Sequence, residues 1–184
     1  GIAFSMKMYG KMSCRYLKDA KIFHVRSGSG RGGAIKKARK NGMKILVDHS
    51  IAHPYFAENY LKLEYEKNGA SFNLGINNPL WKEVIKDCQE ADAILVNSQF
   101  VKDTFIEAGY DSDRIKVAYL GVREGFFDLK QDYHINDKLR ILFTGGFGFR
   151  KGAEYALKAM QELERLGIDY EFIVVGSHDE AQPL

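Results

Sequence analysis

The chain has 184 residues, of which 45% are hydrophobic, and its 27 basic and 24 acidic side chains give a formal net charge of +3. This composition is ordinary for a soluble globular protein; it excludes disordered and collagen-like chains, and the charge is too small to predict a nucleic-acid partner. No stretch approaches the roughly 18 apolar residues of a membrane span and the N-terminus lacks a signal-peptide pattern, so we expect a cytoplasmic protein.

Short β-rich runs alternate with helical patterns along most of the chain. This alternation is typical of the α/β class with a parallel sheet. Residues 1–20 are mixed apolar and basic, and we expect them to form a helix that packs on the sheet. The elements that follow are expected to be a strand over 21–25, a helix over 33–41, a strand over 43–48, a helix from Leu80, a strand over 93–96, a helix from Ser98 to Ala108 and a strand over 115–120.

A local basic cluster lies in and just after the predicted helix over 33–41. Its members are Lys36, Lys37, Arg39, Lys40 and Lys44. One interpretation is a solvated helix face beside the sheet. The other is contact with phosphate or with anionic lipid headgroups, which would place the protein peripherally at the inner face of a membrane.

The alternating pattern lapses after Gly121, over a stretch that is long for a connection inside a compact domain. We interpret residues 123–138 as an interdomain linker between a first domain over 1–122 and a second over 139–184. The second domain is expected to hold one βαβ unit, with strands over 140–143 and 170–175 around a helix over 152–166. Because a second domain of this length is too short to bury a core of its own, we expect the chain to be part of a longer protein.

The first of two glycine-rich turns follows the strand over 21–25. Gly28, Gly30 and Gly33 match the Gly-x-Gly-x-x-Gly pattern, and Asp48 ends the next strand. In dinucleotide-binding proteins such a turn brings backbone amides to a pyrophosphate and a carboxylate to a ribose hydroxyl. An NAD-dependent oxidoreductase is therefore one alternative. A βα loop without a ligand is another, since this turn starts two residues later than usual.

The second glycine-rich turn combines amides with paired cations. Gly145 and Gly146 follow a predicted strand, and Arg150 and Lys151 precede a predicted helix. Amides and cations can converge there on one phosphate, although the residue order is not that of a P-loop. Cations at a helix N-terminus oppose the helix dipole. An anionic ligand bound by these cations would offset this cost. The alternative is that both cations are solvated and bind no ligand.

Two histidines follow the strand over 43–48. His49 and His53 are expected at the carboxyl edge of the sheet, where parallel sheets bind ligands. A neutral imidazole there could hydrogen-bond a sugar hydroxyl or a diphosphate, whereas a single histidine is more often structural. We expect no metal site, because further ligands at a suitable spacing are lacking.

Three segments, in the same order, resemble family 4 glycosyltransferases. Residues 145–152 resemble the start of that family's C-terminal domain, and Ala91–Lys102 is similar to its "A-D-x-(apolar)3-x-S-x-x-x-(K/R)" strand and helix. Residues 114–127 resemble the strand and the "N-G-V-D…F" lead into the family's interdomain hinge. The resemblance covers roughly residues 20–176.

The resemblance implies a two-domain GT-B fold with Rossmann-like parallel sheets. Residues 1–122 would be part of the acceptor-side domain, and residues 139–184 would begin the nucleotide-sugar domain. The implied reaction is a retaining transfer of a sugar from a nucleotide-diphosphate sugar to a glycan, lipid or small-molecule acceptor. It would need neither a metal ion nor another cofactor. The family's Glu-x7-Glu motif is absent from the sequence, so we expect little turnover from this chain alone.

The resemblance also implies the site residues. Lys151 would be catalytic, holding the donor diphosphate and stabilising the leaving group, and His49 would face the donor sugar. Gly146 stands where the family has an arginine, so Arg150 or the amides of Gly145 and Gly146 would take that role.

Two further interpretations follow from the resemblance. His53 is the substitute candidate for the position of His49. The missing arginine also leaves open a non-catalytic sugar- or phosphate-binding module.

Overall fold

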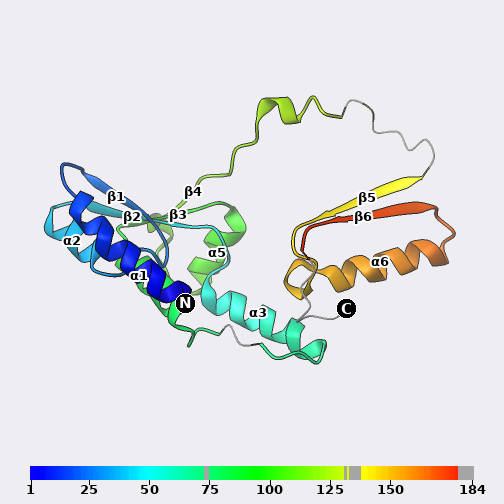
Figure 1. The fold of residues 1–184 in the computed structure, drawn as a ribbon, viewed down its shortest axis with the longest axis horizontal. Coiled ribbons are helices and arrows are strands. Elements are labelled where there is room, and N and C mark those ends of the chain that lie inside the picture. Colours follow the sequence, from blue (N-terminus) through cyan, green and yellow to red (C-terminus); the bar gives the residue numbers. More distant parts are fainter. Residues whose placement is uncertain (73–74, 131, 133–137, 178–184) are drawn as a thin grey trace. The chain divides into compact units, whose positions relative to one another are not determined.

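The computed structural model describes most of the chain, namely residues 1–72, 75–130, 132 and 138–177. The chain is divided into two compact units (Figure 1). Unit 1 is formed by Gly1–Tyr60 and Phe72–Gly121, and unit 2 by Leu61–Ser71 and Val122–Leu184. Part of the predicted linker, residues 131 and 133–137, lies outside the described residues. The rest of the linker contains a short 3-10 turn, Glu124–Phe126.

Unit 1 is built on a parallel sheet whose described strands follow the order β1-β2-β3-β4. The strands are β1 (Ile22–Arg26), β2 (Lys44–His49), β3 (Ala93–Val96) and β4 (Ile115–Val117). Parallel neighbours require crossover connections, and these are formed by α2 (Ala34–Lys40), α4 (Pro79–Glu90) and α5 (Gln99–Glu107). The predicted α/β class with a Rossmann-like parallel sheet is confirmed.

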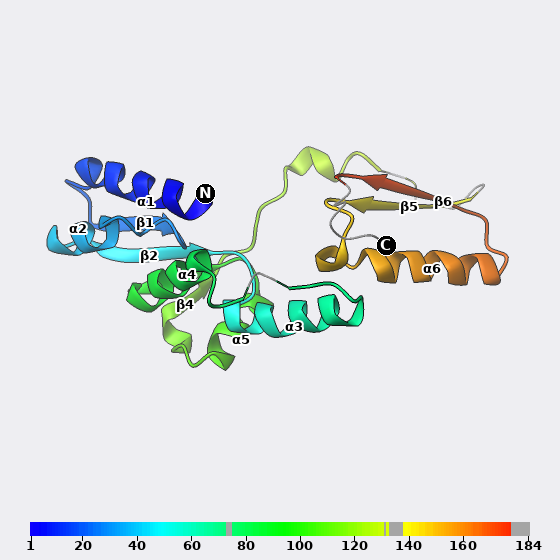
Figure 2. The same ribbon diagram turned by 60° about the horizontal axis from the view of Figure 1, so that its bottom comes forward.

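The core of unit 1 lies between this sheet and the three crossover helices. In β2 the side chains of Ile45, Val47 and His49 share the buried face, and none is more than 1% exposed. Apolar side chains of α2, α4 and α5, among them Cys88 and Phe105, belong to the same cluster. Figure 2 shows α4 and α5 below β1 and β2. His49 therefore continues a row of core residues to the end of its strand.

Local signals explain where these elements begin and end. The hydroxyl of Ser98 accepts a hydrogen bond from the N–H of Val101 at 3.2 Å and caps α5. Gly109, at φ +87°, follows that helix in the left-handed conformation. The strand predicted over 115–120 is shorter than expected, because β4 ends at Val117.

Helix α3 (Pro54–Lys67) was not expected from the sequence. Its large apolar residues do not share one face, and Tyr55, Tyr60 and Leu63 remain exposed. A helix without one apolar stripe gives little signal at the helical period. Its last residues, from Leu61, group with unit 2.

The N-terminal helix α1 (Ile2–Ser13) packs mainly against α2 and α4 rather than on the sheet, and it ends earlier than expected. Two glycines allow a close approach between α1 and the turn that precedes α2. A Cβ atom on Gly10 would lie 1.8 Å from the carbonyl oxygen of Arg31. A Cβ atom on Gly32 would lie 2.2 Å from the carbonyl oxygen of Lys7.

This packing gives a test by substitution of Gly10. Helix propensity alone predicts that Gly10→Ala stabilises α1 by about 1 kcal/mol. The clash with the Arg31 backbone instead predicts a loss of about 1–3 kcal/mol in the free energy of unfolding. Urea denaturation of the chain measures the sign. Gly121→Ala is the control, since a Cβ atom there has open space, and a stabilised Gly10→Ala would contradict the packing.

Unit 2 contains the predicted strand-helix-strand order. Its strands β5 (Leu139–Thr144) and β6 (Tyr170–Val175) pair in parallel, and α6 (Ala153–Arg165) connects them. A short 3-10 turn, Phe149–Lys151, precedes α6. The predicted βαβ unit is confirmed over these described residues.

Candidate functional site

His49 is the last residue of β2, at the carboxyl edge of the unit 1 sheet. Its ring lies edge-on to Phe105 with centroids 5.1 Å apart, and its Nδ1 lies 2.8 Å from the hydroxyl oxygen of Ser27. Burial lowers the pKa of His49 from 6.5 to about 4. The imidazole is therefore neutral at pH 7.

His53 lies in the same aromatic surroundings, just before α3. Its ring contacts Phe105 and Tyr110, with centroids 4.9 and 5.2 Å away. Its backbone N–H donates to the hydroxyl of Thr104 at 2.9 Å, and its Nδ1 accepts from the N–H of Tyr55 at 3.3 Å. Burial, and secondarily the nearby His49, lowers the pKa of His53 to about 4.

The structure thus brings both predicted histidines to the same aromatic ring. Within the described chain, the Nε2 atoms of His49 and His53 are buried without a hydrogen-bond partner. No group of three or more His, Cys, Asp or Glu that could hold a metal ion occurs among those residues. The catalytic role of His49 and the binding role of His53 stay predictions.

The first glycine-rich turn is held by a carboxylate that sequence reasoning missed. The N–H groups of Gly28 and Gly30 donate to Oδ2 of Asp87, at 2.7 and 2.9 Å. Asp87 projects from α4 and is 3% exposed, and burial raises its pKa from 3.8 to about 6. Asp48, the candidate ribose acceptor, forms an ion pair with Arg26 at 3.1 Å. Two of the amides expected to bind a pyrophosphate are therefore occupied.

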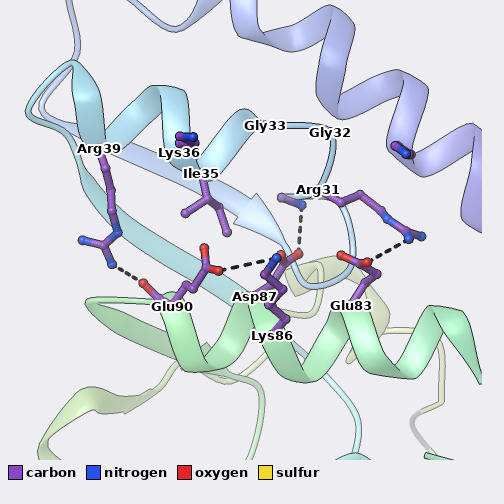
Figure 3. Close-up of a pocket in the computed structure, with 12 residues that line it drawn as sticks. Arg31, Gly32, Gly33, Ile35, Lys36, Arg39, Glu83, Lys86, Asp87 and Glu90 are labelled. Atoms are coloured by element: carbon purple, nitrogen blue, oxygen red, sulfur yellow. Dashed lines mark hydrogen bonds and ion pairs between the residues drawn. The ribbon is translucent and has the colours of Figure 1, made fainter. Parts of the chain in front are cut away.

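A cavity of about 550 Å³ lies beside this turn, between α2 and α4 (Figure 3). Several of its charged side chains are partnered: Arg31 forms an ion pair with Glu83 at 3.1 Å, Lys86 forms one with Glu90 at 3.9 Å, and Arg39 donates to the backbone carbonyl of Glu90. Because Arg31 is paired with Glu83 and the N–H groups of Gly28 and Gly30 are bound to Asp87, the geometry does not support binding of a dinucleotide at this turn. The glycines of this turn are needed instead for the close packing against α1 and against the Asp87 side chain.

All members of the basic cluster are exposed, and two of them also pair with a carboxylate. Arg39 and Lys44 contact the carboxylate of Asp92, at 3.5 and 3.6 Å. Lys36, Lys37 and Lys40 are exposed. Across the described segments, no helix is long and apolar enough to cross a membrane.

The second glycine-rich turn lies at the carboxyl end of β5. Gly145 adopts φ +112°, and its N–H donates to the carbonyl oxygen of Val175 at 2.9 Å. This amide is therefore hydrogen-bonded to β6, and the expectation that it binds a diphosphate stays a prediction. The N–H of Gly146 has no partner in the part of unit 2 that the structure describes.

The paired cations follow the same turn. Lys151 and Arg150 are exposed in the 3-10 turn that the buried Phe149 anchors. A Cβ atom on Gly145 would lie 3.8 Å from Cε of Lys151, so the lysine side chain passes beside the glycine. The structure thus brings together Gly145 and Lys151 at a sheet edge, and it places Arg150 in the same turn.

Helix α3 contributes further side chains to unit 2 that sequence reasoning missed. The ammonium of Lys67 donates to the hydroxyl of Tyr155 at 3.0 Å, and that hydroxyl donates to Glu64 at 2.8 Å. Tyr155 lies in the first turn of α6, close in sequence to Lys151. These contacts fix the end of α3 against the start of α6.

Part of the chain is similar to a known glycosyltransferase. A 65-residue segment is 34% identical to an alpha-D-kanosaminyltransferase of Streptomyces kanamyceticus. The match covers 35% of this chain and only 16% of that protein. No family model matches the chain, and no solved structure matches it significantly. This partial similarity supports a general glycosyltransferase interpretation.

Proposed function

We propose that the chain is part of a retaining, metal-independent glycosyltransferase that uses a nucleotide-diphosphate sugar as donor. The observation that carries this proposal is Lys151, whose side chain passes beside Gly145 where the parallel strand β5 ends. The partial similarity to a kanosaminyltransferase supports the same class of reaction. Retention, metal independence and a glycan, lipid or small-molecule acceptor are taken from the sequence resemblance.

The proposed chemistry depends on negative charge that grows as the nucleoside diphosphate leaves. The ammonium of Lys151, the guanidinium of Arg150 and the N–H of Gly146 would stabilise that charge more strongly in the transition state than in the bound donor. Two cations would thereby supply the charge neutralisation that a metal ion supplies in other transferases. Unit 2 would bind the donor, and the role of His49 as a neutral hydrogen-bonding group is taken from the sequence resemblance.

Calorimetric titration tests this assignment on the protein that contains this sequence, at its full natural length. We expect one of UDP, GDP and ADP to bind, and Lys151→Ala to weaken that binding by about 10- to 100-fold, the effect of one lost charged hydrogen bond. Lys158→Ala is the control, because this lysine pairs with Glu154 on α6. Binding of NAD that Lys151→Ala leaves unchanged would contradict the proposal.

A further inference from the structure

Ser27 and His49 form a buried pair at the edge of the unit 1 sheet. Their Oγ and Nδ1 atoms are 2.8 Å apart, and the side chains come from the ends of the neighbouring strands β1 and β2. Both residues are less than 10% exposed. The N–H of Ser27 also donates to the carbonyl oxygen of Asp48 at 2.9 Å, which fixes the serine backbone against β2.

The hydrogen bonds around this pair select one tautomer of His49. In the described chain the Ser27 hydroxyl has no partner other than Nδ1. If Nδ1 carried the proton, the hydroxyl proton would be buried without an acceptor, which is costly. The hydroxyl therefore donates to Nδ1, and the imidazole proton is assigned to Nε2. Among the described residues, an Nδ1–H ring would leave both the hydroxyl proton and the Nε2 lone pair without a partner, whereas an Nε2–H ring leaves only the Nε2 proton without one.

Asp87 holds the serine in place from the other side of the turn. Its Oδ2 accepts from the N–H groups of Gly28 and Gly30, the first of which directly follows Ser27. The N–H of Ser29 donates to the carbonyl oxygen of Arg26 at 2.9 Å and tightens the same turn. The position of the serine hydroxyl is therefore determined by backbone contacts on both sides.

We propose that Ser27 is a positioning residue that holds His49 in the neutral Nε2–H tautomer. With Nδ1 occupied by the serine proton and Nε2 protonated, the ring has no free lone pair. The buried Nε2–H is then the one polar group of the ring left to donate a hydrogen bond, and His49 does not act as a general base. The tautomer follows from this chain's geometry, whereas its consequence for transfer rests on the proposed function.

Long-range ¹H–¹⁵N correlation spectra of the histidine-labelled chain read the tautomer directly. The His49 signals are assigned by their loss in His49→Gln. We expect the Nε2–H pattern in the wild-type chain and in Ser27→Thr, which keeps the hydroxyl. Ser27→Ala should lose that single pattern, whereas Ser29→Ala, two residues along the same turn, should keep it. An Nδ1–H pattern in the wild-type chain, or no change in Ser27→Ala, would overturn the proposal.

A transfer assay on the full-length protein separates this proposal from the proposed function. Ser27→Ala should lower kcat by about tenfold, the effect of one misplaced hydrogen bond, with KM for the donor little changed. Ser27→Thr should restore the rate. If the tautomer changes in the spectra while kcat does not, the positioning by Ser27 stands and the role given to His49 in transfer is wrong.

Discussion

Phe105→Ala is expected to lower the free energy of unfolding by about 3–5 kcal/mol, the usual cost of removing a fully buried phenylalanine ring. Phe105 is 0% exposed, and its ring contacts both His49 and His53. The substitution removes the apolar wall that the two imidazoles share. Water admitted to the resulting cavity should also raise the pKa of each histidine from about 4 toward 6.5.

Urea denaturation and histidine NMR titration measure the two effects separately. Phe100→Ala is the matched control, because Phe100 lies on the same helix α5 but is 59% exposed. It should cost less than about 1 kcal/mol and leave both titrations unchanged. Phe105→Leu should fall between the two in stability, since it refills most of the volume. Equal losses from Phe105→Ala and Phe100→Ala would contradict the packing around the histidines.

The sequence predicts the repeating part of the fold because the signals are local. Alternation of β-rich and helical runs identifies the strands and the crossover helices, and Ser98 identifies the start of α5 by its own capping hydrogen bond. The domain boundary after Gly121 stays a prediction, and the structure groups the distant segment Leu61–Ser71 with Val122–Leu184 in unit 2. Helix α3 is missed because its exposed apolar residues, such as Leu63, do not form one stripe.

The candidate site depends more on contacts between distant residues, which periodicity cannot show. The glycine spacing at Gly28 and Gly30 is typical of a pyrophosphate site, yet their N–H groups bind Asp87, 59 and 57 residues away. Asp87 is next in sequence to the buried Cys88, but this position alone does not identify the glycine amides as its partners. The pairing of Ser27 with His49 is likewise determined by strand register and not by any motif.

The buried histidines should make the stability of the chain depend on pH. The pKa of His49 is about 4 in the folded chain and about 6.5 when exposed, so between these values the unfolded chain binds more protons. The free energy of unfolding contributed by His49 therefore rises as pH rises from 4 to 6.5, by about 3 kcal/mol at 1.36 kcal/mol per pKa unit. The lowered pKa of His53 acts in the same direction.

Asp87 acts in the opposite direction over nearly the same range. Its pKa is raised from 3.8 to about 6 by burial, so between these values the folded chain binds more protons and stability falls as pH rises. The dependence of the wild-type free energy of unfolding on pH contains both opposing contributions. The difference in free energy of unfolding between the wild-type chain and each variant separates them. Urea denaturation at intervals from pH 4 to pH 7 gives these differences.

The stability of the wild-type chain relative to His49→Gln should increase by about 3 kcal/mol from pH 4 to pH 7. The stability relative to Asp87→Asn should decrease over the same range. His24→Gln is the control, since this histidine is exposed on β1 and lies outside the buried cluster. A flat difference for His49→Gln would mean that the imidazole reaches solvent in the folded chain. The statement that His49 is buried and neutral, on which the proposed tautomer depends, would then be wrong.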